Sequence, residues 1–367
     1  MPIDGPFALR DRPRAPAAAG RPINPGCLQA EILEWFAEHR RPLVGREDRE
    51  PWRVLVLEVM SQQTQIERSL AGSAAFCSRF PTPAALATAS PADAVRAWAG
   101  LGYNRRALAL RSAAQQIVER HGGHVPGDIK ALDDLPGIGP YTARAVAARA
   151  FGVRVIPVDV NVRRVLGRML GRPRGATEAR EIQALADAIA AAQSAHVDGG
   201  AAPGPLHTGQ LSGASSPPYP GDIADALMDL AAALCKPRAP DCAACPLLSW
   251  CTWAVIASRA ATAGLSAVTG EGASTTARSA DTTVCEVGSS ESNLRSRPAA
   301  LPFSATRRWL RGQLLRELRT APPGTWLSIE GARGSHAHAS VRETLATLAR
   351  EGFVELDERG HARLSET

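Results

Sequence analysis

A glycine-containing turn between two helical segments constrains the fold of this chain more than any other stretch. It reads LPGIGPYTARAV over residues 135–146, with Gly137 and Gly139 directly before a helix-forming run. Glycines let two helices approach closely, and the backbone N–H groups at the start of the second helix then form a site for an anion such as phosphate. Many helical hairpins use such a turn for packing only, so the stretch predicts a helical hairpin and leaves its function open.

The rest of the chain reads mainly as helix after helix, with one continuous helix expected over residues 51–80. Ser90 and Pro91, for example, supply a cap and a first-turn proline to one helical segment. No stretch reads as a strand before the C-terminal segment, and a chain of 367 residues is long enough for roughly two or three domains. The sequence therefore predicts an all-α fold.

Several segments depart from this helical pattern. Residues 1–25 are rich in Pro, Arg and Ala and are expected to be disordered. Residues 194–221 read as a flexible insertion and residues 259–300 as a linker, because small and turn-forming residues dominate both. Residues 301–367 hold two amphipathic stretches and two short apolar stretches around DERG, which predict a small winged-helix-like module. A packing domain that never contacts nucleic acid is an equal alternative for this module.

Charge and hydropathy restrict the partners and the compartment. The net charge of +6 and the pI near 9.2 favour a polyanionic partner without proving one. No apolar run approaches the roughly 18 residues that a membrane span needs, and the N-terminal stretch lacks the apolar region of a signal peptide. We therefore expect a cytoplasmic protein without a membrane partner, in which the seven cysteines form no disulfide framework.

Four of the cysteines are spaced C-x6-C-x2-C-x5-C within CKPRAPDCAACPLLSWC: Cys235, Cys242, Cys245 and Cys251. Four thiolates so close in sequence can hold one metal centre. A zinc site is the alternative, although zinc usually uses two C-x2-C pairs and only one is present here. Lys236 and Arg238, between the first two cysteines, are placed to meet a phosphate, or are idle surface charges. Cys27, Cys77 and Cys285 are isolated.

The cysteine spacing resembles the [4Fe–4S] loop of the endonuclease III superfamily. Together with LPGIG, it makes residues 28–256 resemble the helix-hairpin-helix DNA glycosylases. The resemblance implies a two-lobed all-α core over residues 26–258 that carries a [4Fe–4S] cluster and binds DNA between its lobes. A six-helix barrel lobe would span residues 50–165, and the cluster lobe would join residues 26–49 to residues 166–258.

The same resemblance assigns roles to Tyr141 and Asp159. Members that also cut the DNA strand carry a lysine where this chain has Tyr141, and a phenol cannot form the lysine's Schiff base. Asp159, in VIPVDVNV, matches the catalytic aspartate that stabilises the positive charge developing on the sugar. Asn161 matches a residue that orients the catalytic carboxylates. Without the hairpin upstream, Asp159 would read only as a helix cap.

The stretch LEVMSQQTQ resembles the corresponding helix of adenine-specific DNA glycosylases of the MutY type, with Ser61 in place of the usual Leu. Glu58 matches the acid that protonates N7 of adenine, and this acid must carry its proton near neutral pH, which apolar neighbours favour. Gln63 and Thr64 match residues that enter the duplex opposite the extruded adenine. Tyr103 matches an intercalating tyrosine beside the orphan base, and Arg105 and Arg106, which follow it closely, would suit the phosphate backbone.

Further matches concern the adenine pocket. Arg46 matches an arginine that lines it in some members, and Asp225 takes the place of a polar residue that faces adenine. Gly45 replaces a tryptophan of the pocket wall. No segment after residue 258 resembles the Nudix-like domain with which well-studied members recognise 8-oxoguanine.

The resemblance implies a monofunctional, monomeric DNA glycosylase that excises adenine opposite 8-oxoguanine or guanine from double-stranded DNA in a bacterial nucleoid. A thymine or uracil mismatch glycosylase of the same superfamily is one alternative. A non-catalytic DNA-docking protein is another, although docking alone would need neither Glu58 nor Asp159.

Overall fold

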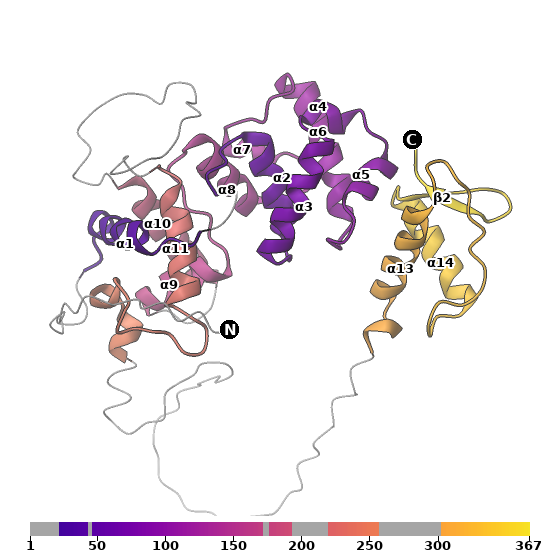
Figure 1. The fold of residues 1–367 in the computed structure, drawn as a ribbon. Coiled ribbons are helices and arrows are strands. Elements are labelled where there is room, and N and C mark those ends of the chain that lie inside the picture. The colour runs from indigo at the N-terminus through magenta and orange to yellow at the C-terminus, as the bar shows by residue number, and fades with distance from the viewer. Residues whose placement is uncertain (1–21, 43–45, 172–175, 193–218, 257–301) are drawn as a thin grey trace, which may run out of the picture. The chain divides into compact units, whose positions relative to one another are not determined.

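The computed structural model of the chain describes residues 22–42, 46–171, 176–192, 219–256 and 302–367 (Figure 1). Most of the expected N-terminal disorder, most of the expected insertion, the whole expected linker and Gly45 lie outside these residues. None of the described helices is long and apolar enough to cross a membrane.

The chain forms two compact units that interleave in sequence. Unit 1 takes in residues 1–58, 126–134 and 138–269, and unit 2 takes in residues 59–125, 135–137 and 270–367. The lobe boundaries expected from the sequence stay a prediction.

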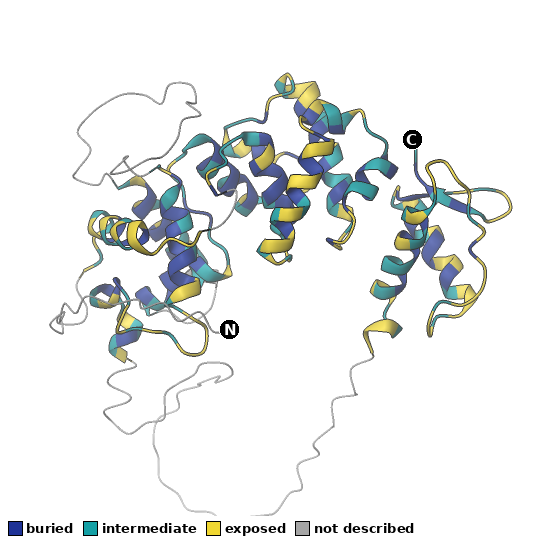
Figure 2. Ribbon diagram, in the orientation of Figure 1, coloured by how far each residue is buried: buried dark blue, intermediate teal, exposed yellow. Residues whose placement is uncertain are grey.

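Unit 1 holds several helices, with α2 included only as far as Glu58, and the chain is helical again over residues 252–256. The helices with defined bounds are α1 (Pro25–His39), α2 (Pro51–Ser61), α7 (Ile129–Asp133), α8 (Pro140–Phe151), α9 (Val160–Leu170), α10 (Ala176–Ala191) and α11 (Asp222–Ala233), followed by a 3₁₀ turn at Leu248–Trp250. The core lies between α1, α9, α10 and α11, whose inward faces are buried (Figure 2). Apolar side chains such as Ile32, Leu166 and Leu227 fill it with no exposed area.

The ends of these helices follow from local sequence. Asn24 caps α1, because its side chain accepts hydrogen bonds from the backbone N–H groups of Gly26 and Cys27. Gly152 and Gly171 end α8 and α9 in the left-handed conformation that glycine adopts without strain.

Unit 2 holds the remaining helices and both strands. They are α3 (Ile66–Arg79), α4 (Pro83–Ala87), α5 (Pro91–Ala97), α6 (Arg105–His121), a 3₁₀ turn at Phe303–Ala305, α13 (Arg307–Thr320), α14 (His338–Arg350), β1 (Val354–Leu356) and β2 (Ala362–Leu364). The two strands pair antiparallel, with Val354 opposite Leu364, around the DERG turn. The C-terminal segment is thus two helices followed by a β-hairpin.

The structure corrects one helix expected from the sequence. Residues 51–80 read as a single helix, but the chain leaves the helix after Ser61 and re-enters it at Ile66. Gln63 lies in the break with φ of +55°, which a helix cannot contain. The QQTQ stretch is therefore a loop between α2 and α3.

Candidate active site

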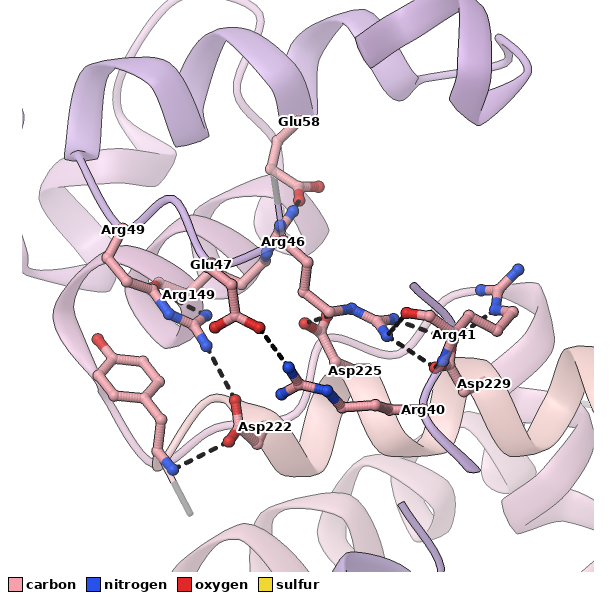
Figure 3. A network of polar contacts seen from close by, with 11 residues as sticks. Arg40, Arg41, Arg46, Glu47, Arg49, Glu58, Arg149, Asp222, Asp225 and Asp229 are labelled. Atoms are coloured by element: carbon pink, nitrogen blue, oxygen red, sulfur yellow. Dashed lines mark hydrogen bonds and ion pairs between the residues drawn. The ribbon is translucent and has the colours of Figure 1, made fainter. Parts of the chain in front are cut away.

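Glu58, predicted to be the general acid, lies in an ion pair. Arg149 of α8 donates from Nη1 to Oε1 of Glu58 over 2.6 Å (Figure 3). Both side chains are largely buried, with 11% of Glu58 and 14% of Arg149 exposed. Leu57 and Val59 flank the carboxylate along α2 and are buried. The expected apolar neighbours are present, and a cationic partner that the sequence analysis missed accompanies them.

Tyr141 lies in the electrostatic neighbourhood of Glu58 and Asp159. Burial raises the pKa of the Tyr141 phenol above its usual value, and the two carboxylates raise it further. The phenol therefore keeps its proton at neutral pH and is a hydrogen-bond donor, not a nucleophile. Three of the predicted residues, carried by α2, α8 and the start of α9, thus come together in unit 1.

Asp159 caps helix α9, and this fixes its carboxylate. Its Oδ1 accepts hydrogen bonds from the backbone N–H groups of Asn161 at 2.8 Å and Val162 at 2.7 Å. Its Oδ2 accepts from the side-chain amide of Asn161 at 2.7 Å. Asp159 is therefore both the cap of α9 and the residue predicted to be the catalytic aspartate.

Arg164 extends this network along α9. Its Nη1 donates to Oδ1 of Asn161 at 3.1 Å, and its Nε donates to the backbone carbonyl of Cys235 at 2.7 Å. The side-chain amide of Asn161 is therefore fixed both at its nitrogen and at its oxygen. Asn161 and Arg164 thereby connect Asp159, through hydrogen bonds, to Cys235, the first cysteine of the predicted cluster.

Arg46 lies on the other side of the site, in a buried pair with Asp229 of α11. Its Nη1 and Nη2 donate to the two carboxylate oxygens of Asp229 at 2.8 and 2.9 Å, and Arg41 adds another hydrogen bond (Figure 3). Burial raises the pKa of Asp229, but the hydrogen bonds from Arg46 and Arg41 outweigh it and leave the pKa below its usual value. Asp229 was not predicted from the sequence.

Asp225, one turn before Asp229, contributes an unsatisfied carboxylate oxygen. Its Oδ2 lies 3.4 Å from Nε of Arg46, as an ion pair. Within the described residues, Oδ2 of Asp225 and Nε of Arg149 are buried without a hydrogen-bond partner. A buried acceptor and a buried donor without partners are costly in a folded protein, and such atoms are common where a ligand supplies the missing bonds.

Gln63 and Tyr103, the two residues predicted to enter the duplex with Thr64, share an unusual backbone conformation. In the part of the chain that the structure describes, they are the two non-glycine residues with positive φ, at +55° and +45°. Gln63 is exposed, and 43% of Tyr103 is exposed. Strained backbone in exposed loops is frequent at functional sites, because selection for stability alone would remove it.

Arg106 braces both loops. Its Nη1 donates to the carbonyls of Val59, Met60 and Gln62 at 2.9, 2.9 and 2.6 Å, and its Nη2 donates to Oγ1 of Thr64 at 3.2 Å. The sequence analysis took Arg106 for a cation suited to the DNA backbone. That assignment is wrong, because backbone carbonyls already occupy its guanidinium.

The two glycines of the hairpin have different roles. Gly137 has φ of +78°, and a Cβ at this position would lie 2.7 Å from Cβ of Ala109, so close approach and conformation both require glycine. Gly139 begins α8 with an ordinary φ of −107°, and a Cβ there would meet nothing within 4 Å. The space beside the first N–H groups of α8 is therefore open, as an anion site requires.

The four cysteines of the loop after α11 line one pocket: Cys235, Cys242, Cys245 and Cys251. The pKa of the Cys245 thiol is raised to about 12, chiefly by burial and also by the other three sulfurs, against a hydrogen bond from the backbone of Leu247 that lowers it. Among the described residues, no three His, Cys, Asp or Glu side chains are close enough to hold a single metal ion.

Arg168 of α9 closes the pocket on one side. It donates to Sγ of Cys235 at 3.3 Å and to the carbonyls of Lys236 and Pro237, both at 2.8 Å. The predicted phosphate ligands Lys236 and Arg238 are exposed on the outside of this loop.

Comparison with known proteins assigns the family. Residues 56–204 match the model described as HhH-GPD superfamily base excision DNA repair protein. The adenine DNA glycosylase of Mycolicibacterium smegmatis is 39% identical over 224 residues, which cover 61% of this chain and 68% of that protein. The chain belongs to the HhH-GPD superfamily of base excision DNA repair proteins. The predicted resemblance and the all-α glycosylase fold are thereby confirmed.

Two further similarities accompany this assignment to the HhH-GPD superfamily. The adenine DNA glycosylase of Mycobacterium tuberculosis is 42% identical over 223 residues, which cover 60% of this chain and 66% of that protein. A solved structure of a thermostable thymine-DNA glycosylase aligns with a TM-score of 0.52 at 25% identity, over 63% of this chain and 97% of that structure. The chain thus spans about two thirds of the length of these mycobacterial relatives.

The HhH-GPD match contains most of the predicted site: Glu58, Gln63, Thr64, Tyr103, Gly137, Gly139, Tyr141, Asp159 and Asn161. Arg46, Asp225 and the cysteine loop lie outside the matched residues. The site residues that sequence reasoning missed, Arg149 and Asp229, occur in alanine-rich helices. Only their burial in the fold distinguishes them from ordinary surface charges.

Proposed function

We propose that the chain is a monofunctional adenine DNA glycosylase that removes adenine paired with 8-oxoguanine or guanine. The observation that carries the proposal is the meeting of Glu58, Asp159 and a protonated Tyr141 in one buried site. The relatives named adenine DNA glycosylase support it. Double-stranded DNA is then the partner of a monomeric, cytoplasmic protein associated with the nucleoid.

Glu58 supplies the proton in this proposal. Neutral adenine is a poor leaving group, and a positioned acid that protonates N7 accelerates its departure by roughly 10²- to 10⁴-fold. The ion pair with Arg149 holds the carboxylate in place at 2.6 Å until a base enters. Glu58 must exchange that contact for the base before it can act as the acid.

Asp159 stabilises the sugar cation that forms as the bond to the base breaks. The hydrogen bonds from Asn161 and Val162 fix its orientation, so that its charge is placed before the reaction begins. Tyr141 offers no amine for a Schiff base, so the strand stays intact after the base leaves.

Asp225 is suited to select the base. Its buried Oδ2 has no hydrogen-bond partner among the described residues, and an exocyclic amine would supply one. Adenine carries such an amine at C6, whereas thymine and uracil present a carbonyl at the corresponding edge. The buried Arg46–Asp229 pair supports the helix that carries Asp225.

In this proposal, the loops that Arg106 stabilises contact the strand opposite the adenine. Gln63, Thr64 and Tyr103 fill the space that the extruded adenine leaves and contact the orphan base. The open start of α8 behind Gly139, with Lys236 and Arg238, binds phosphates in this proposal. Binding should therefore weaken steeply with salt.

The cysteine loop fits a [4Fe–4S] cluster. All four thiols line one pocket, and a four-iron cluster takes four thiolate ligands. Cys235, Cys242, Cys245 and Cys251 would hold it, and when bound it would fix the loop that carries Lys236 and Arg238.

A thymine or uracil mismatch glycosylase is the second candidate, favoured by the likeness to a solved thymine-DNA glycosylase. The buried acid and the Asp225 oxygen without a hydrogen-bond partner among the described residues distinguish the two proposals, because removal of thymine or uracil makes no use of an acceptor for an exocyclic amine. A docking protein without activity would need neither feature.

The test is a base-release assay on four duplexes, with A opposite 8-oxoguanine, A opposite G, T opposite G and U opposite G. Each is treated with and without hot alkali, for the wild type, for Glu58→Gln and for the control Glu119→Gln, which changes an exposed glutamate of α6. We expect alkali-dependent cleavage at adenine alone, lost only in Glu58→Gln. Release of T or U that is insensitive to the Glu58 change would support the mismatch glycosylase, and binding without release would support the docking protein.

A further inference from the structure

The C-terminal module, residues 302–367, packs against α5 in the same unit as Tyr103. The backbone N–H of Ala92 donates to the carbonyl of Ser365 over 2.7 Å. Ala92 and Val95 share a buried apolar cluster with residues of α13, α14 and the hairpin. Backbone and core contacts therefore fix the module to α5.

The module also contacts the loop that carries Tyr103. The guanidinium carbon of Arg308 lies 4.4 Å from the centroid of the Tyr103 ring, and Nη1 of Arg319 donates to Oδ1 of Asn104 at 3.4 Å. Two consecutive residues of this loop thus touch arginines of α13. When Tyr103 enters the base stack, as proposed, Arg308 and Arg319 come close to the phosphates that flank it.

Arg308, Arg316 and Arg319 share one side of α13, because spacings of eight and eleven residues place them within about 80° of one another around the helix. Within the described residues, none of the three has a carboxylate partner. On the same helix, Arg307 and Arg311 each form an ion pair with a glutamate. The side of α13 whose arginines contact Tyr103 and Asn104 is therefore the side without ion pairs.

We propose that this side of α13, defined by Arg308, Arg316 and Arg319, is part of the DNA interface and binds phosphates beside the base pair that Tyr103 enters. The inference rests on the proposed function, which brings Tyr103 to DNA. Arginine forks match phosphate geometry, and contacts to phosphate fix the register of a protein on the duplex. The module thereby supports recognition of the strand opposite the extruded base.

The test uses the full chain and a duplex with 2′-fluoro-deoxyadenosine opposite 8-oxoguanine, which resists cleavage. Affinity is measured by fluorescence anisotropy over a series of salt concentrations for the wild type and for Arg308→Gln/Arg316→Gln. The control Arg342→Gln/Arg359→Gln removes two exposed arginines from α14 and the hairpin turn of the same module. Each lost phosphate contact lowers the slope of log affinity against log salt by about 0.9.

We expect the first double variant to bind about 10-fold more weakly and to lose about 2 from the slope, while the control keeps the wild-type values. Arg308→Lys/Arg316→Lys should regain most of the slope, because it keeps both charges. Wild-type slope and affinity in Arg308→Gln/Arg316→Gln would overturn the inference and make the module a packing domain. Absence of adenine release by the wild type would instead overturn the proposed function, so the two failures are distinguishable.

Discussion

The guanidinium of Arg149 donates to the carboxylate of Glu58 over 2.6 Å, and the two residues are 91 positions apart in the sequence. The proposed acid is thus held at rest by a cation. In the proposed reaction, the pair has to separate before adenine can be protonated.

Replacement of Arg149 should destabilise the fold around Glu58. In Arg149→Leu the buried carboxylate loses the guanidinium that donates to it over 2.6 Å, which costs about 3–5 kcal/mol. Arg149→Lys keeps the charge and should recover part of that loss. Urea unfolding of the wild type and both variants at pH 7 checks this, and equal free energies of unfolding for the wild type and Arg149→Leu would show that the ion pair does not hold Glu58.

Loss of the Asp229 carboxylate should destabilise unit 1. In Asp229→Asn, the buried guanidinium of Arg46 loses the carboxylate to which it donates two hydrogen bonds and keeps only the longer ion pair with Asp225, which costs about 3–5 kcal/mol. Because the pKa of Asp229 is depressed in the folded state, its stabilisation is present above the pKa of the unfolded chain, near 4, and is lost as the pH falls through the folded value. Urea unfolding at pH 7 should show the full difference between wild type and variant, and the difference should shrink below about pH 4. A difference that stays constant down to acid pH would contradict this account.

The two hairpin glycines should respond differently to alanine. Gly137→Ala places a Cβ 2.7 Å from that of Ala109 at a φ of +78°, so we expect a loss of about 1–3 kcal/mol in the free energy of unfolding. Gly139→Ala adds its Cβ to open space and should stay within about 0.5 kcal/mol of the wild type. Thermal unfolding of both variants checks this, and equal losses at the two positions would refute it.

Replacement of single cysteines by serine should distinguish the predicted cluster ligands from the isolated cysteines. Cys245→Ser, purified under argon, should lose iron and the visible absorbance of an iron–sulfur cluster. Cys27→Ser changes an exposed cysteine outside the loop and should keep both. Zinc, in place of iron and sulfide, in the wild-type protein would overturn the cluster assignment.

The sequence predicted the part of the site that depends on short motifs. Glu58, Tyr141 and Asp159 were each recognisable from their immediate neighbours, and the fold brings them together as expected. Arg149 and Asp229 could not be found in that way, because a charged residue in an alanine-rich helix looks the same whether it faces water or a buried partner. Their roles depend on contacts between segments far apart in the chain.

Two errors have the same physical origin. Gln62 and Gln65 are good helix formers, so propensity predicted a continuous helix through a stretch that forms a loop. Arg106 was read as a phosphate ligand because a sequence displays a positive charge but not the backbone carbonyls that surround it. In both cases, contacts between segments that are distant in the sequence decide the outcome, and a local stretch of sequence does not display them.

The positive φ values of Gln63 and Tyr103 have a consequence for any attempt to improve this protein. Each strained residue costs about 1–3 kcal/mol, which a glycine would recover. A laboratory selection for heat resistance alone would therefore favour glycine at these positions, and each gain in melting temperature would erode the duplex contacts proposed for the two loops. Thermostability and the proposed repair activity would be traded against each other at these two residues.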